Sequence, residues 1–143
     1  MKILLAVDES TYSQAAKNAL ISQMQPTNAE VRVLNVVEPS IGEYQSADVL
    51  EGARKAKLEY ASQLTSRLAK ELKNAGFASQ PVVEEGEATH SIVEFAEKWQ
   101  PDYVFLGSHG RTGWKRFALG SVSEAVAHKV PCSVVIVRSG HEH

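Results

Sequence analysis

The glycines of the segment GSHGRTGWKRFALGS are spaced in a way that suits the binding of a phosphate group. Two residues separate Gly107 from Gly110, and nine separate Gly110 from Gly120. Glycine lets the backbone approach a ligand closely, and a helix that starts at Ser121 would offer unpaired N–H groups and the positive end of its dipole. Ser121 and Glu124 also fit a capping box, S-x-x-E, which would explain the serine without a ligand.

The same segment concentrates positive charge in a chain that is slightly acidic overall. Arg111, Lys115 and Arg116 lie in it, and no carboxylate occurs between Asp102 and Glu124. This predicts a local positive field, as an anion site requires, whereas a glycine-rich loop with solvated charges is the simpler alternative. The segment lacks the G-x-x-x-x-G-K-[ST] pattern of a P-loop, and the chain lacks G-x-G-x-x-G after its first apolar run. A phosphate site here would therefore be of another kind.

A second candidate group closes the first apolar run of the chain. The carboxylate of Asp8 could accept hydrogen bonds from a ribose or help to hold a metal ion, although Asp and Ser are also common helix caps. Ser108 and His109 are adjacent, but no third residue is identifiable that would complete a catalytic unit, so hydrolase chemistry is not predicted. His90 and His128 lack Cys or acidic partners at metal-ligand spacing, so we expect them to be solvated or to cap helices.

Short apolar runs alternate with segments of helical periodicity along the whole chain. The predicted strands are Lys2–Val7, Val31–Val37, Phe77–Glu85, Tyr103–Leu106 and Ser133–Val137. The predicted helices are one that starts at Ser10, a long one with an apolar stripe of Leu50, Ala53, Ala56, Tyr60, Leu64, Leu68 and Leu72, one over Ile92–Trp99 and one over Ser121–Lys129. This alternation predicts an α/β fold with one domain over residues 1–143: a doubly wound, five-stranded parallel sheet with helices on both faces. In such a sheet the ligand crevice lies beyond the carboxyl ends of the strands, where the winding direction reverses.

Two of the predicted strands carry signs of a position at the edge of the sheet. Pro81 interrupts the third strand, and proline is tolerated mainly at edges. The last segment, Ser133–Arg138, ends the alternating series and has no Pro, Lys or Glu in its middle that would discourage pairing. An unprotected apolar edge predicts a partner strand, and therefore a homodimer through Ser133–Arg138.

Composition limits the class of protein. The chain has 143 residues, of which 43% are hydrophobic, enough for one core. A net charge of -2 argues against a general binder of nucleic acid or of membrane surfaces, and no apolar run reaches the ~18–20 residues of a membrane span. The single Cys132 rules out an internal disulfide and is expected to be a small buried hydrophobe. The start, MKILLAVDES, is too short and too soon acidic for a signal peptide, so we expect a cytoplasmic protein.

These features together resemble the universal stress protein family. The pattern Gly107-x2-Gly110-x9-Gly120-Ser121 is similar to the nucleotide-binding motif of that family, and the resemblance extends from ILLAVDES through VLNVV and Gly86 to PCSVVIV. It implies a Rossmann-like fold of the adenine nucleotide alpha hydrolase type and dimerisation through the last strand. It also implies binding of ATP, or of ADP or AMP, with Mg²⁺ or Mn²⁺ as an accompanying ion.

The resemblance further assigns residues to the nucleotide. Asp8 would lie near the ribose and could hold a metal ion through the bound nucleotide, and Val36 would contact the adenine. The residues implied to line the nucleotide are Ala6, Val7, Asp8, Val36, Leu106, Gly107, Gly110, Gly120, Ser121, Val122 and Ser123, with His109 and Arg111 as secondary candidates. Glu9 and the pair Glu84-Glu85 depart from the family pattern, and they would weaken the binding of a polyphosphate or favour one held with a divalent metal.

The function implied by the resemblance is a stress-response protein that binds an adenine nucleotide and changes its interactions with unknown partner proteins accordingly. Slow ATP hydrolysis or phosphotransfer is an alternative, but the sequence shows no evident general base that would activate water. A nucleotide-free dimeric scaffold of chaperone-like kind is another. A phosphoacceptor receiver domain shares the alternating order of elements, but Gly86 and Arg138-Ser139 stand where its acceptor Asp and its Lys would be needed.

Overall fold

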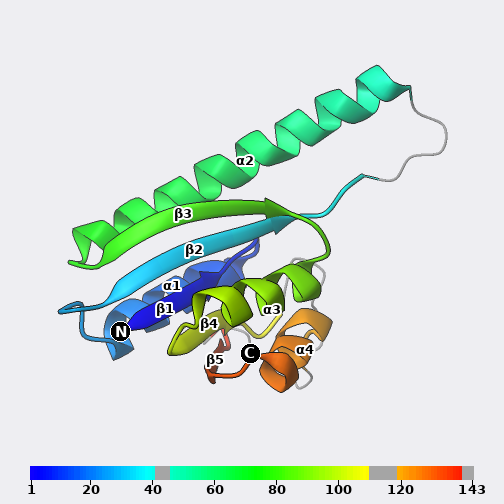
Figure 1. Cartoon of the computed structure of the whole chain (residues 1–143). Coiled ribbons are helices and arrows are strands. Elements are labelled where there is room, and N and C mark those ends of the chain that lie inside the picture. Colours follow the sequence, from blue (N-terminus) through cyan, green and yellow to red (C-terminus); the bar gives the residue numbers. More distant parts are fainter. Residues whose placement is uncertain (41–45, 110–118, 140–143) are drawn as a thin grey trace.

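A computed structural model of the chain describes residues 1–40, 46–109 and 119–139 (Figure 1). Its strands are β1 (Lys2–Ala6), β2 (Glu30–Val37), β3 (Ala78–Glu85), β4 (Tyr103–Gly107) and β5 (Ser133–Val137). Its helices are α1 (Thr11–Gln23), α2 (Ala47–Asn74), α3 (Ala88–Trp99) and α4 (Ser121–Lys129). Strands and helices alternate in the predicted order, with small shifts at their ends.

The strands form one parallel sheet in the order β3-β2-β1-β4-β5. From β1 the chain winds outward to β3, crosses back to β4 and continues to β5, so the winding direction reverses between β1 and β4. Ala6 is level with Leu34 on one side and with Leu106 on the other, so the carboxyl ends of these strands lie side by side. The doubly wound sheet is confirmed, and β3 and β5 lie at its edges as predicted. In sheets of this kind a ligand binds beyond the strand ends at the reversal point, here β1 and β4.

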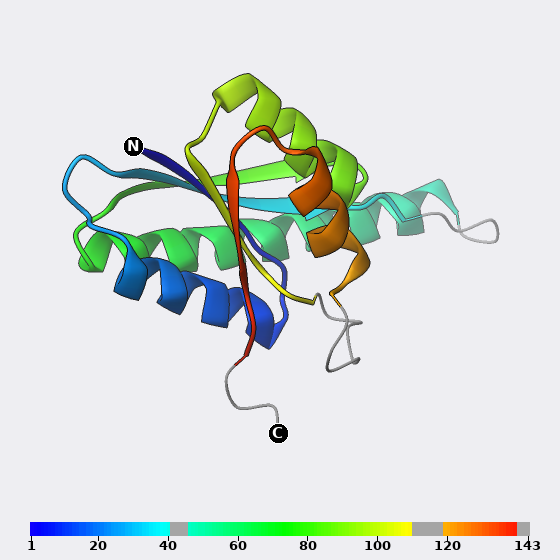
Figure 2. The same ribbon diagram turned by 90° about the horizontal axis from the view of Figure 1, so that it is seen from below.

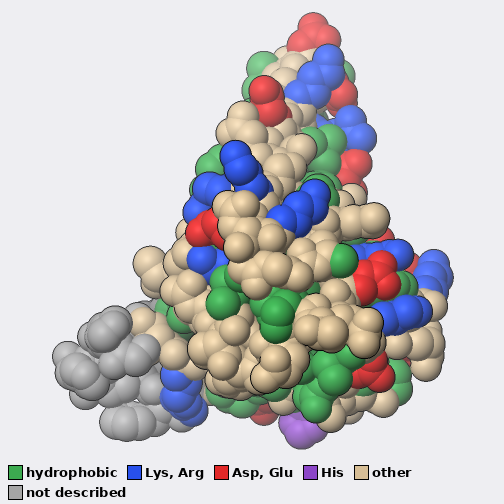
Figure 3. All heavy atoms as spheres, turned by 90° about the vertical axis from the view of Figure 1, so that its left-hand side faces the viewer, with side chains coloured by type: hydrophobic (Ala, Val, Ile, Leu, Met, Phe, Trp, Pro, Cys, Tyr) green, Lys and Arg blue, Asp and Glu red, His purple; other side chains and the backbone are tan. Residues whose placement is uncertain are grey.

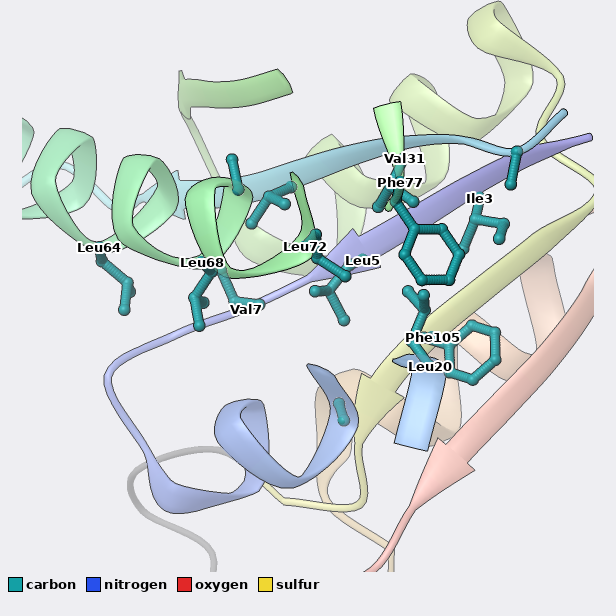
Figure 4. Close-up of a cluster of buried hydrophobic side chains, with 14 residues drawn as sticks. Ile3, Leu5, Val7, Leu20, Val31, Leu64, Leu68, Leu72, Phe77 and Phe105 are labelled. Carbon is teal, nitrogen blue, oxygen red and sulfur yellow. The ribbon is translucent and has the colours of Figure 1, made fainter. Parts of the chain in front are cut away.

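Both faces of the sheet are covered by helices, which explains why the inner strands are apolar at successive positions. Ile3 and Leu5 of β1 belong to a core with α1 and α2, whereas Leu4 belongs to a second core with α3 and α4. Figure 2 shows the two pairs of helices on opposite sides of the sheet. In the first core, Leu68 and Leu72 of α2 point toward the strands (Figure 4).

The first half of α2 does not pack as the sequence pattern predicts. The fully buried residues of this helix begin at Ala61, whereas Tyr60 is 55% and Val49 is 53% exposed. The helix has 28 residues and is about 42 Å long, but the eight-residue strands beneath it span only about 26 Å. It therefore projects past the sheet as a ridge with charges of both signs (Figures 1 and 3). Neither this helix nor any other in the described ranges has the length and apolar character needed to cross a membrane.

One ion pair links the two helices of the first core. Lys17 of α1 is 5% exposed, and its Nζ lies 2.9 Å from Oε1 of Glu71 on α2. The hydrogen bond from Lys17 lowers the pKa of Glu71, against the opposing effect of partial burial. Because a buried ammonium group needs a partner, Glu71 compensates the burial of Lys17 and links α1 to α2.

Candidate functional site

The segment after β1 holds the carboxylate of Asp8 in one orientation. Oδ1 of Asp8 accepts hydrogen bonds from the backbone N–H of Ser10 at 2.9 Å and from Oγ of Ser13 at 3.0 Å. Ser13 Oγ in turn accepts the backbone N–H of Asp8 at 2.7 Å. The N-cap of α1 is Ser10, whose side chain makes no capping bond. Asp8 therefore orders the entry into α1 through Oδ1, and its Oδ2 has no hydrogen bond to any described residue.

A buried asparagine on the neighbouring strand fixes the end of β1. Nδ2 of Asn35 donates to the carbonyl oxygen of Val7 at 2.6 Å, and the N–H of Val7 donates to the carbonyl of Leu34 at 2.9 Å. Asn35 was not among the predicted site residues, although a lone amide inside the apolar run VLNVV was a signal for it. The next residue, Val36, is half-buried and packs against the core of α3 and α4. The end of β2 thus holds the segment that leads to Asp8.

Two glycines of the predicted motif allow close contacts between backbone segments. A Cβ atom on Gly107 would overlap Cβ of Tyr12 and would lie 3.0 Å from the backbone C and O of the same residue. A Cβ atom on Gly120 would lie 3.1 Å from the carbonyl oxygen of Ser108 and 3.2 Å from Cα of His109. Side chains at these positions would push α1 and α4 away from the end of β4. The glycines therefore have a packing role, whether or not a ligand binds.

The start of α4 lacks the capping box that the sequence predicts. The N-cap is Gly120, one residue before Ser121, and it has no side chain that could accept from the first-turn amides. The N–H of Gly120 donates to the carbonyl of Ser108 at 2.8 Å, and the helix begins at the next residue, Ser121. Ser123, 2% exposed, donates to the carbonyls of Ser108 and Gly120. The N-cap therefore supplies no side-chain acceptor to the first-turn amides of α4, which lack partners within the helix.

Ser108 and His109 connect the end of β4 to both helices. Oγ of Ser108 lies 3.1 Å from Nδ1 of His109, and the imidazole ring packs against Tyr12 with 5.3 Å between ring centroids. Nε2 of His109 is buried without a hydrogen-bond partner in the described residues. A catalytic triad would need a carboxylate to orient the second ring nitrogen. Among the described residues no carboxylate is hydrogen-bonded to this nitrogen.

The structure separates the implied nucleotide-lining residues into two groups. The side chains of Ala6, Val7, Leu106 and Ser123 are buried, so these residues can offer little beyond their backbone. Asp8, Val36, Gly107, Gly120, Ser121 and Val122 are partly or fully exposed. Gly110 and Arg111 lie outside the described residues.

The acidic end of β3 is partly neutralised. Arg54 of α2 donates two hydrogen bonds to the carboxylate of Glu85, both at 2.8 Å, and these bonds hold the pKa of Glu85 below its usual value. The predicted repulsion of a polyphosphate is therefore reduced at Glu85. The described residues contain no group of three or more His, Cys, Asp or Glu that could hold a metal ion.

Known proteins are similar to this chain in sequence and architecture. The family model that matches, over residues 1–138, is that of the Universal stress protein family. A universal stress protein of Methanocaldococcus jannaschii is 31% identical over 141 residues, which cover 96% of this chain and 81% of the relative. The structure of hypothetical protein MJ0577 matches with a TM-score of 0.89, 28% identity and coverage of 99% and 97% of the two chains. That of UspA from Lactobacillus plantarum matches with a TM-score of 0.84, 26% identity and coverage of 96% and 97%. The chain belongs to the universal stress protein family.

Proposed function

We propose that this chain binds ATP or a related adenine nucleotide beyond the carboxyl ends of β1 and β4, and acts as a nucleotide-dependent regulatory module in the stress response. One arrangement carries the proposal. Asp8, whose Oδ2 accepts no hydrogen bond from the described residues, follows β1, and α4, which has no side-chain cap, starts beside the end of β4, at the reversal point of the winding. An acceptor for ribose hydroxyls and donors for phosphate thus occur on adjacent strand ends.

In this proposal the nucleotide spans the crevice from β2 to α4. The phosphates accept hydrogen bonds from the amides of Ser121 and its two successors, where the helix dipole also favours negative charge. The ribose lies at Asp8 and the adenine near Val36. Mg²⁺ or Mn²⁺ would arrive with the phosphates, and Asp8 could serve as one of its ligands.

Relatives of known structure support an adenine nucleotide. One universal stress protein was solved in complex with cAMP, and it shares 22% identity and a TM-score of 0.70 with this chain. A family member from Arabidopsis thaliana was solved with AMP bound, at 15% identity and a TM-score of 0.71. At these identities the likeness concerns the fold. Transfer of the ligand rests on the site described above.

The first experiment identifies the ligand. Protein purified without added nucleotide is denatured, and the released small molecules are identified by mass spectrometry; titration calorimetry then measures binding of ATP, ADP and AMP with Mg²⁺. We expect an adenine nucleotide in near-stoichiometric amount or clear binding on titration. Absence of both would refute the proposal.

A pair of glycine variants locates the phosphates. Gly120→Val places a branched side chain against the backbone of Ser108 and His109, so it should abolish nucleotide binding. Gly52→Val is the matched control, because nothing lies within 4 Å of a Cβ at Gly52. Unchanged affinity in folded Gly120→Val would show that the phosphates bind elsewhere. If phosphate release from ATP is seen in the wild type, it should disappear in Gly120→Val; release that survives comes from a contaminant.

We further propose that the protein forms a homodimer through β5 and works in the cytoplasm. β5 lies at the sheet edge with Val134 through Val137 only half-buried, and the free Cys132 accords with a reducing compartment. Val135→Lys should shift the mass measured by light scattering from dimer to monomer. The control is Val49→Lys at the exposed start of α2, which should leave the mass unchanged. A wild type that is monomeric at micromolar concentration would contradict the dimer.

A further inference from the structure

The carboxylate of Asp8 is held by a closed arrangement of hydrogen bonds in which Ser13 is the central group. The hydroxyl of Ser13 accepts the backbone N–H of Asp8 at 2.7 Å and donates to Oδ1 of the same residue at 3.0 Å. The N–H of Ser10 is the second donor to Oδ1, at 2.9 Å. Both donors to the carboxylate reach Oδ1, and no described residue donates to Oδ2.

Burial makes Ser13 hard to replace. Ser13 is 5% exposed, so little room exists for water to take over its two hydrogen bonds. Because its hydroxyl both accepts and donates within one small ring, the hydroxyl hydrogen has a single favourable direction. The carboxylate plane of Asp8 is then restrained about both of its side-chain bonds. Without Ser13 the N–H of Ser10 alone would restrain it.

We propose that Ser13 is a positioning residue that aims Oδ2 of Asp8 at the ribose, and that the site thereby selects ribonucleotides over nucleotides that lack a ribose hydroxyl. This inference rests on the proposed function and adds a selectivity to it. An ionised carboxylate accepts strong hydrogen bonds, and a buried or half-buried acceptor that loses its donor is penalised. The penalty is largest when the acceptor cannot turn to water. Because Ser13 restrains the carboxylate, a nucleotide that lacks the ribose hydroxyl should bind more weakly than one that has it.

The test compares ATP with 2′-deoxy-ATP and 3′-deoxy-ATP by titration calorimetry. For wild type we expect at least one deoxy analogue to bind about tenfold more weakly than ATP, as for loss of a hydrogen bond to a charged group. In Ser13→Ala the ratio of the dissociation constant of that deoxy analogue to that of ATP should fall to about threefold or less, because the freed carboxylate can turn toward solvent. Ser13→Thr keeps a hydroxyl and should restore the wild-type ratio.

A double-mutant comparison separates positioning from general damage. Asp8→Asn removes the charge while its Oδ1 can still accept both donors, so it should lower the ribose ratio by itself. If Ser13 acts only through Asp8, then adding Ser13→Ala to Asp8→Asn should change the ratio no further. Ser79→Ala is the matched control: Ser79 is 4% exposed on β3, away from the crevice, and its hydroxyl has no partner in the described residues.

The outcomes are distinct. A wild type that binds ATP with no preference over either deoxy analogue would overturn the inference and leave the proposed function standing. So would a folded Ser13→Ala variant that keeps the wild-type ratio. If Ser13→Ala does not fold, an unchanged ratio in Asp8→Asn would overturn the inference in its place. A wild type that binds no adenine nucleotide would overturn both proposals.

Discussion

Gly107 offers the sharpest test of how α1 is placed at the site. The residue ends β4, and its backbone lies directly against the backbone of Tyr12 in the first turn of α1. Its φ angle does not lie in the left-handed region, so alanine is conformationally acceptable there. Gly107→Ala therefore tests the close approach of β4 to α1 without introducing backbone strain at residue 107.

The magnitude follows from what the added methyl group would meet. It would overlap Cβ of Tyr12 and lie 3.0 Å from the backbone C and O of that residue. Backbone atoms cannot rotate away, so α1 must shift relative to β4. Overpacking of this kind costs about 2 kcal/mol, which for a chain of this length lowers Tm by about 6 °C.

Urea unfolding followed by circular dichroism, at one fixed protein concentration, measures the effect. Gly52→Ala is the matched control, since Gly52 lies in the exposed part of α2 with nothing within 4 Å of a Cβ. There alanine should stabilise the protein, by up to about 1 kcal/mol, because it favours the helix. The same substitution is thus expected to lower the free energy of unfolding at Gly107 and to raise it at Gly52. A Gly107→Ala variant as stable as wild type would refute the close packing of α1 on β4.

Three further predictions follow from the polar contacts. The pKa of Glu71 is lower in the folded protein than its ordinary value of 4.5, so its pair with Lys17 stabilises the fold above about that pH and loses this effect as the pH falls through the folded pKa. The difference in unfolding free energy between wild type and Glu71→Gln should therefore shrink from pH 7 to pH 3. A difference that stays constant over this range would contradict the prediction. Burial, and secondarily the charge of Asp102, raises the pKa of Cys132. At pH 7.5 iodoacetamide should therefore modify Cys132 more slowly in the folded wild type than in the unfolded chain, and faster in folded Asp102→Asn than in folded wild type. Equal rates in the two folded proteins would exclude the charge effect. Asn35→Ala leaves a carbonyl at the end of β1 without its partner and should cost about 2 kcal/mol of unfolding free energy, measured by urea unfolding; a neutral effect would show that the hydrogen bond is replaced.

Local sequence patterns were enough to predict the elements and their winding. Apolar runs with prolines and glycines at their ends mark the strands, and Pro81 and the uncharged run after Ser133 correctly placed β3 and β5 at the edges. Patterns were less reliable for α2. The apolar stripe that includes Tyr60 continues the periodicity of the buried half, but periodicity carries no information about where the sheet beneath it ends.

The candidate site shows the same division. Glycine spacing, together with the resemblance that it carries, indicated Gly107, Gly120 and Asp8, because strand ends, glycines and acids are local signals. The sequence pattern did not indicate that Ser13 restrains Asp8. The capping box predicted at Ser121 was wrong, because the N-cap of α4 is Gly120. The first depends on the local path of the turn from Asp8 into α1, and the second on the contact of Gly120 with Ser108 at the end of β4.

The sequence by itself determined the order of the elements, the parallel doubly wound sheet and the end of the sheet at which a ligand would lie, since each follows from short-range patterning and the handedness of crossovers. Only the tertiary structure decided which polar atoms are occupied. Oδ1 of Asp8 is bound by Ser10 and Ser13, the N–H of Gly120 is bound by Ser108, and the first-turn amides of α4 are not capped by Gly120. Hydrogen bonds form between groups that the fold brings within 3 Å or so, and no spacing along the chain specifies that distance.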